Sequence, residues 1–63
     1  MIGKFETPQR GKCAIDFERV EAITTDENKP GCVSIVTHND VYNIIADFDD
    51  VVDKWIEYQR GKP

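Results

Sequence analysis

The stretch from Cys32 to Gln59 most constrains the fold, because its hydrophobic period changes once and abruptly. It reads CVSIVTHNDVYNIIADFDDVVDKWIEYQ. Two runs rich in β-branched residues, Cys32–Thr37 and Val41–Ala46, flank the polar corner at 38–40, which predicts a β-hairpin. The residues that follow repeat their apolar side chains every three or four positions, as a helix does. A hairpin followed by an amphipathic helix must bury the helix against the sheet.

The predicted helix spans about residues 48–60 and begins at Asp47. An Asp at this position caps a helix by accepting a backbone N–H, and Asp50 suits the positive end of the helix dipole. Arg60 suits the opposite end, and Gly61 is expected to end the helix. The positions of the apolar stripe, with Tyr58 on its flank, are Phe48, Val51, Val52, Trp55, Ile56 and Gln59.

The residues before this stretch predict additional strands. Ile2–Thr7 and Lys12–Ile15 form a hairpin around a turn that ends in Gly11, and Val20–Asp26 is β-branched. Asp16 is expected to cap a single helical turn that directs Phe17 inward. The sequence predicts an α+β fold in one domain, residues 1–63. Its strands lie within 2–46, in an antiparallel sheet of four to five strands with one C-terminal amphipathic helix packed on it.

The hairpin at 32–46 has two apolar sides. With Asn39-Asp40 as the corner, Thr37 faces Tyr42, Ile35 faces Ile44 and Val33 faces Ala46 on the side that we expect to be the core. The other side is too apolar for water, so we expect the N-terminal strands, the helix or a second subunit to cover it. The predicted oligomer contacts are Val36, Val41, Ile45 and Tyr58.

Charge and composition exclude several classes of function. The chain has 63 residues, with 8 Lys and Arg against 12 Asp and Glu, a net charge of −4. A nucleic-acid binder needs a basic excess, so we expect none. No run approaches the roughly 20 apolar residues of a membrane span, and no apolar signal stretch follows Met1, so we expect a cytoplasmic protein. Cys13 and Cys32 are expected to be reduced, small apolar side chains, with a disulfide or a reactive thiol as the alternative.

No catalytic, metal-binding or phosphate-cradling motif occurs in the sequence. His38 is the single histidine, so no cluster of histidine ligands can form within one chain. The acidic residues around the helix start are interpreted as caps and partners of the helix dipole rather than as an acid–base pair. We therefore expect no enzymatic activity, no cofactor and no metal.

Three basic side chains, Arg10, Lys12 and Arg19, are candidate contacts for an anion. Basic residues on a strand also serve as a solvated edge that discourages aggregation, and the sequence leaves both readings open. If subunits bring them together, Arg offers bidentate recognition of a phosphate group. Neutral partners for such a ligand are Thr37, Tyr42 and Asn43, and His38 is a further candidate at the hairpin corner.

The segments "IDFERVEAIT", "SIVTHNDVYNI" and "FDDVVDKWIEYQR" together resemble the small FlbD/SwrD-type bacterial proteins associated with flagella. The order of elements is also similar to half of a LytTR-type DNA-binding domain. The resemblance covers residues 13–60 and implies strands, a hairpin and a closing helix. It further implies a role as an adaptor that touches another protein. This chain departs from the pattern at 38–40, where such proteins carry a Gly, and it lacks the basic loops of a LytTR domain.

The sequence therefore predicts a non-enzymatic, homo-oligomeric binding or regulatory module that acts by sequestration or as an adaptor. Two narrower hypotheses compete. One is a phage-type sponge that sequesters a nucleotide-derived immune signal in a pocket between subunits, since a short chain gains a pocket by symmetry. The other is a FlbD/SwrD-like flagellar adaptor. The partners expected are a second copy of the chain and either an anionic nucleotide-like small molecule or another protein.

Overall fold

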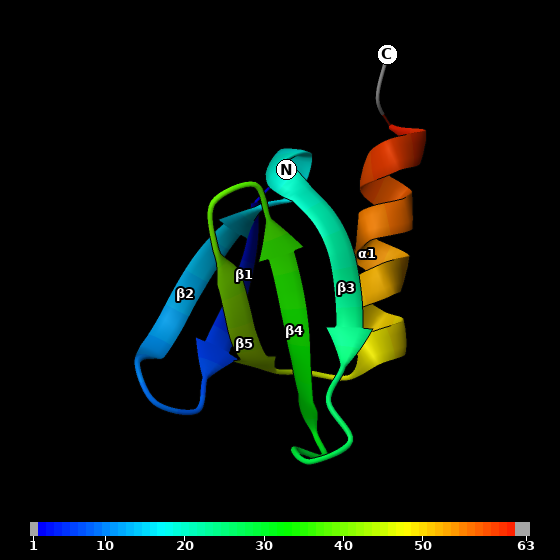
Figure 1. Cartoon of the computed structure of the whole chain (residues 1–63). Helices are drawn as coiled ribbons and strands as arrows, with labels where there is room; N and C mark the ends of the chain where they lie inside the picture. The colour runs from blue at the N-terminus through cyan, green and yellow to red at the C-terminus, as the bar shows by residue number, and fades with distance from the viewer. Residues whose placement is uncertain (1, 62–63) are drawn as a thin grey trace.

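The computed structural model describes residues 2–61, which form a five-stranded antiparallel sheet and one C-terminal helix (Figure 1). The predicted α+β fold is confirmed. The elements, in chain order, are β1 (Ile2–Thr7), β2 (Gly11–Asp16), a 3-10 turn η1 (Phe17–Arg19), β3 (Val20–Thr25), β4 (Cys32–Thr37), β5 (Val41–Ile45) and α1 (Phe48–Arg60).

The sheet consists of two units that meet at β5. Strands β1 and β2 form one hairpin, and β3, β4 and β5 form a meander, so that the strand order is β2-β1-β5-β4-β3. The two units are joined through one register pair, Glu6 with Ile45. The helix lies against β3 at the other side of the fold from β2 (Figure 1). Strand β5 is therefore central, and β2 and β3 are the edges.

Two turns depend on glycine at a positive φ. Gly11, at +77°, closes the β1–β2 loop, where the Thr7 hydroxyl donates to the Gly11 carbonyl at 2.7 Å. Gly31, at +84°, follows Pro30, and the amide of Cys32 donates to the Lys29 carbonyl at 3.1 Å. This is the arrangement of a type II turn, in which Pro supplies the second residue and Gly the third.

The β4–β5 hairpin turns one position earlier than the sequence predicted, at His38-Asn39 instead of Asn39-Asp40. Ile35 pairs with Tyr42 and Val33 with Ile44, so the predicted register was wrong by two residues. Thr37 is the reason: its amide donates to the Asp40 carbonyl at 2.9 Å, and its Oγ1 accepts from the Asp40 amide at 3.2 Å. These bonds close a loop over 37–40. Because side chains alternate with a period of two, the predicted faces stay the same.

The core forms between the sheet and the helix. Phe17 is fully buried, and the Asp16 carboxylate accepts from the Glu18 amide at 3.0 Å, which confirms the predicted cap. We call the side of the sheet that faces this core the inner face and the opposite side the outer face. The buried apolar residues are Phe5, Ile15, Phe17, Val20, Val33, Ile35, Ile44 and Val51.

The helix begins at its predicted cap and is turned slightly from its predicted orientation. The Asp47 carboxylate accepts from the Asp50 amide at 3.3 Å. Val51 is buried, and Phe48, Trp55 and Tyr58 pack against the core. Ile56 is 43% exposed and Gln59 is also exposed, so it was wrong to place them within the buried stripe. The buried line runs through 48, 51, 55 and 58, which is a narrower face than the sequence predicted.

Candidate functional site

The outer face of the β4–β5 hairpin carries apolar side chains that the described part of the chain covers only in part. Val36 pairs with Val41, and Cys32 pairs with Ile45. Val41 is 61% exposed and Ile45 is 51% exposed, although both belong to the central strand. We call these four residues (Cys32, Val36, Val41 and Ile45) the outer-face patch.

The middle of the outer-face patch is polar. Ser34 pairs with Asn43 between the two apolar pairs, and the Ser34 hydroxyl donates to Asn43 Oδ1 at 2.8 Å. The hydrogen bond satisfies two polar groups that would otherwise need water if the patch were covered. Along the hairpin, the patch therefore has an apolar cross-strand pair at each end and a polar pair between them.

The fourth predicted oligomer contact lies elsewhere. Tyr58 is on α1, packs against the core, and has its ring centroid 6.5 Å from that of Phe17. Three of the four predicted contacts thus share one surface, and Tyr58 belongs to the opposite side of the sheet. The helical spacing of the sequence placed Tyr58 at the flank of the apolar stripe and did not show that it packs against the core.

The predicted ligand residues divide between two pockets that meet at Tyr42. Arg19, Thr37, His38 and Tyr42 line a pocket of about 240 Å³ at the end of β2. Arg10, Tyr42 and Asn43 line another, of about 390 Å³, beside the β1–β2 loop. Lys12 lines neither of them. The structure brings four predicted side chains together that are spread over 24 positions of the sequence, from 19 to 42.

The smaller of these pockets has mixed charge. Asp16 and Asp40 line it together with Arg19. The imidazole of His38 contacts the carboxylate of Glu21, and both side chains are largely exposed. Arg19 is thus the single Lys or Arg among the described residues that line this pocket, and it would be the contact for an anion.

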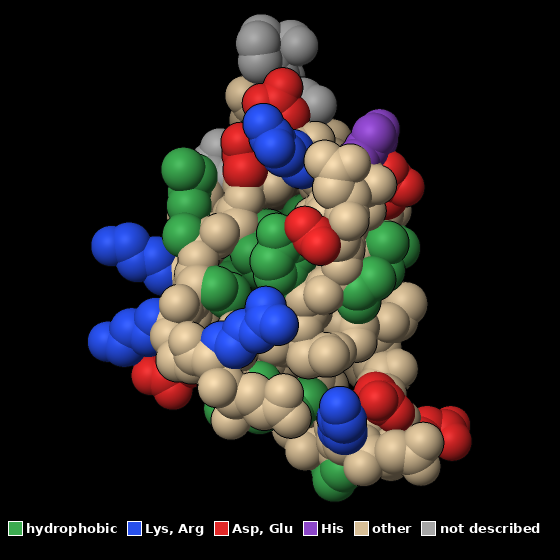
Figure 2. Space-filling model, turned by 60° about the vertical axis from the view of Figure 1, so that its left-hand side comes forward, with side chains coloured by type: hydrophobic (Ala, Val, Ile, Leu, Met, Phe, Trp, Pro, Cys, Tyr) green, Lys and Arg blue, Asp and Glu red, His purple; other side chains and the backbone are tan. Residues whose placement is uncertain are grey.

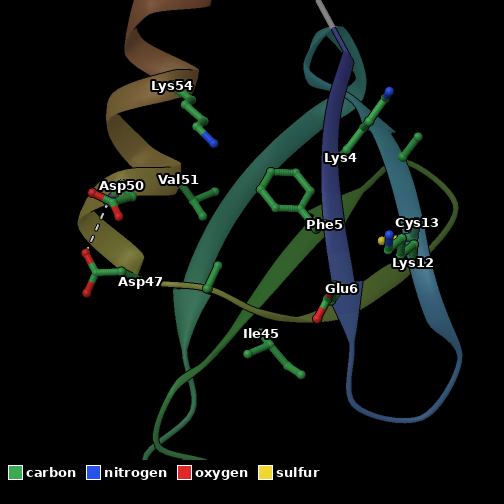
Figure 3. A pocket seen from close by; sticks show the side chains of 12 residues that line it. Lys4, Phe5, Glu6, Lys12, Cys13, Ile45, Asp47, Asp50, Val51 and Lys54 are labelled. Atoms are coloured by element: carbon green, nitrogen blue, oxygen red, sulfur yellow. Dashed lines mark hydrogen bonds between the residues drawn. The ribbon is translucent and has the colours of Figure 1, made fainter.

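A larger cleft, which the sequence did not predict, lies between the β1–β2 hairpin and the start of α1 (Figure 3). It measures about 690 Å³, and Phe5 and Val51 form part of its wall. Lys54 reaches over Phe5, with Nζ 5.7 Å from the ring centroid, in a cation–π arrangement. The lysines of the cleft are Lys4, Lys12 and Lys54, and its acids are Glu6, Asp47 and Asp50.

The acids of this cleft have structural roles at the helix start. Asp47 accepts from the Asp50 amide, as Figure 3 shows, and both lie in or beside the first turn of α1. The equal number of lysines and acids leaves the cleft without a net preference for anions. The sequence missed it because its walls come from three separated segments, and only the spacing of Asp50 and Lys54 on one helix face pointed toward it.

Cys13 and Cys32 are both free thiols and half-buried. Cys13 packs against the core from β2, whereas Cys32 lies in the outer-face patch. Within residues 2–61, no three potential metal ligands of the His, Cys, Asp or Glu type come together. In the same part of the chain, no helix combines the length and apolar character needed to cross a bilayer.

Comparisons with protein-family models, with curated proteins and with solved structures found no match to this chain. The resemblance to FlbD/SwrD-type and LytTR-type proteins therefore stays a prediction.

Proposed function

We propose that this protein is a small, non-enzymatic binding module of the cytoplasm that works as a homo-oligomer, with copies meeting through the outer-face patch. The observation that carries the proposal is the exposure of Val41 and Ile45, at 61% and 51%, on the central strand of the sheet. A central strand is normally covered on an apolar face, and uncovered apolar patches mark contact surfaces.

The size of the chain supports self-association. A domain of about 60 residues buries only about 60% of the surface of its unfolded chain, so its own core supplies little stability. Here one layer of the core is supplied by a single helix of 13 residues on one side of the sheet. A second copy against the outer-face patch would bury Val36, Val41 and Ile45 without adding any residue to the chain.

The experiment is size-exclusion chromatography with light scattering over a range of concentrations. We expect a mass at least twice the 7.2 kDa of the chain. The double variant Val41→Ser/Ile45→Ser removes the two most exposed apolar groups of the patch, so its mass should fall by half. Ile56→Ser is the matched control, because Ile56 is also exposed but lies on α1, and its mass should equal that of the unchanged protein.

Two results would reject the contact through the outer-face patch. One is an unchanged protein that is monomeric at about 100 µM, since a contact of this kind is expected to reach micromolar affinity. The other is a Val41→Ser/Ile45→Ser variant that keeps the full mass. Circular dichroism on each variant separates loss of association from loss of fold.

A second candidate function is capture of an anionic, nucleotide-like small molecule. It is favoured by the meeting of Arg19, Thr37, His38 and Tyr42 around one pocket. That pocket measures about 240 Å³, less than the roughly 300–1,000 Å³ of most small-molecule sites. It can receive a phosphate group, whereas the rest of a nucleotide would need a surface from a second subunit.

A thermal-shift panel of nucleotides and cyclic nucleotides tests this second function. A ligand present at 100 times its Kd stabilises the protein by about 2.7 kcal/mol, which is a readily measured shift. Arg19→Ala should abolish the shift, and Arg60→Ala, an exposed change at the end of α1 that lines neither pocket, should leave it intact. No shift with any member of the panel would reject capture of a nucleotide.

A further inference from the structure

One edge of the sheet is open. Strand β2 pairs with β1 on one side, and on its other side no described strand forms a ladder with it. Figure 1 shows β2 at the margin of the fold. In an antiparallel pair, alternate residues direct their N–H and C=O groups away from the partner strand. The outer side of β2 therefore offers backbone donors and acceptors to another strand.

The other edge is protected in two ways. Strand β3 has a register irregularity between Val20 and Ala22, and α1 lies against it. Bulges and covering helices are common devices that prevent edge-to-edge pairing. Strand β2 has neither device among the described residues, and it pairs with β1 without a break from Gly11 to Asp16.

The outer-face side chains of β2 are Lys12, Ala14 and Asp16, in that order along the strand. Antiparallel pairing of two copies reverses this order. When Ala14 lies opposite Ala14 of the partner subunit, a twofold axis passes between them. Lys12 then lies opposite Asp16 of the partner subunit, and Asp16 lies opposite Lys12 of the partner subunit. Among the residues of β2 itself, a register centred on Cys13 or Ile15 brings no such pair together.

We propose that β2 pairs antiparallel with β2 of a second copy, centred on Ala14, to join two sheets into one. The contact is self-complementary in charge and in shape: Ala14, at the axis, is small and exposed, and Lys12 is exposed. Asp16 uses Oδ1 to accept from the Glu18 amide at 3.0 Å, and its second carboxylate oxygen remains for Lys12 of the partner subunit. Opposite charges across strands stabilise antiparallel pairs.

The surface around β2 agrees with such a contact. Figure 2, turned so that the left-hand side of Figure 1 comes forward, shows basic and acidic side chains intermixed around an exposed apolar area. On the inner face the same register places Cys13 opposite Ile15 of the partner subunit, an apolar pair. If one strand slid by one residue, inner-face side chains of one copy would lie opposite outer-face side chains of the other.

This contact goes beyond the proposed function, because it uses a different strand from the outer-face patch. If the twofold axes of the two contacts cross at right angles, the two contacts together close an assembly of four chains. Loss of either contact halves the mass, and loss of both leaves a single chain.

Complementary charge reversal tests the contact through β2. Lys12→Glu places Glu opposite Asp16, and Asp16→Lys places Lys opposite Lys12, so each variant alone repels itself. We expect the mass of each to fall by half, with the dimer Kd raised about tenfold or more, since opposite pairs become like-charged pairs on both sides of the axis. An equimolar mixture of the two variants restores both opposite pairs and should recover the full mass.

Ala14→Cys tests the register directly. Two Cα atoms opposite each other across paired strands lie about 4.5–5.5 Å apart, within the range of a disulfide. Mild oxidation should give a covalent dimer joined through residue 14, identified by peptide mass spectrometry. The unchanged protein, with Cys13 and Cys32, is the control for other disulfides. Arg60→Glu, at the exposed end of α1, is the control for charge reversal away from β2.

The outcomes separate this proposal from the preceding one. Full mass for Lys12→Glu with its fold intact by circular dichroism, or no disulfide through residue 14, overturns pairing through β2. Val41→Ser/Ile45→Ser with Ala14→Cys should still cross-link, because the outer-face patch takes no part in this contact. A cross-link that persists while the mass is unaffected by Val41→Ser/Ile45→Ser rejects the outer-face contact and leaves the β2 contact standing.

Discussion

Gly3 lies directly against the ring of Phe17: a Cβ on Gly3 would stand 2.8 Å from Cε2 of Phe17. It would also stand 2.7 Å from Cε2 of Phe5, whose ring meets that of Phe17 edge to face with centroids 6.2 Å apart. Gly3 is buried in β1 and is required there by space rather than by backbone conformation. Phe17 is the largest fully buried side chain among the described residues, and its ring and that of Phe5 lie over a position without a side chain.

Gly3→Ala is therefore expected to destabilise the protein by about 1–3 kcal/mol, the usual cost of overpacking a core. Urea unfolding followed by circular dichroism measures the change. Gly61→Ala is the matched control, because a Cβ there meets its nearest atom at 3.6 Å, an ordinary contact. If both variants unfold at the same urea concentration, the packing around Gly3 is not as tight as described.

Asp47→Ala should lower the free energy of unfolding by about 1 kcal/mol, the typical effect of losing an N-cap. The Asp47 carboxylate accepts from the Asp50 amide at 3.3 Å, and its removal would leave that amide without this acceptor. Asp49→Ala serves as the comparison, since Asp49 lies in the same first turn without capping it. Its loss should be smaller, about 0.3–1 kcal/mol, from the helix dipole alone. An equal effect of both changes would contradict the capping role.

Gly31→Ala isolates a backbone effect. Gly31 has a φ of +84°, and a Cβ there would meet nothing within 4 Å, so strain is the sole expected cost. We expect a loss of about 1–2 kcal/mol in thermal unfolding, the penalty of an L-residue in the left-handed region. Gly31→Asn should lose less, because Asn tolerates this conformation. A neutral Gly31→Ala would mean that the loop adopts another turn.

His38→Ala should leave stability within about 0.5 kcal/mol of the unchanged protein. The contact between His38 and Glu21 is exposed, at 79% and 51% of the two side chains. Water screens such pairs, so their net contribution is small. A thermal melt of His38→Ala beside Glu21→Ala checks this. A drop of several degrees in either variant would indicate that the pair supports the β4–β5 loop.

Local signals in the sequence predicted most of the elements correctly. Asp16 before Phe17 predicted the short turn that buries Phe17, and Pro30-Gly31 predicted a type II turn, because each signal is a bond or a torsion within four residues. The predicted β4–β5 register was wrong because two local signals in the same loop favour different turns. The Thr37 hydroxyl bonds to Asp40 and favours a turn over 37–40, whereas Asn39-Asp40 favours a turn one position later. The sequence does not show which of these two turns is the more stable.

The candidate site was predicted in part. Alternation placed Val36, Val41 and Ile45 on one face, and that grouping survived the shift in register because the shift was even. The sequence named Arg19 and Tyr42 among the candidate ligand contacts but expected subunits to bring them together. It did not show that they meet within one chain, because Arg19 reaches the pocket only through the path of η1. The cleft of Lys4 and Lys54 was missed, since its walls come from strands and a helix that are distant in sequence.

The sequence by itself determined the order of elements, the turns at Gly11 and Gly31 and the two faces of the β4–β5 hairpin, because periodicity, caps and glycine torsions act over a few residues. Only the tertiary structure decided that β1 joins the meander through Glu6 and Ile45, and hence that β5 is central and β2 is an open edge. Strand order depends on packing between segments that are distant in sequence. The strand order is what makes the exposed apolar side chains of β5 and the opposite charges of Lys12 and Asp16 on β2 candidates for contacts between copies.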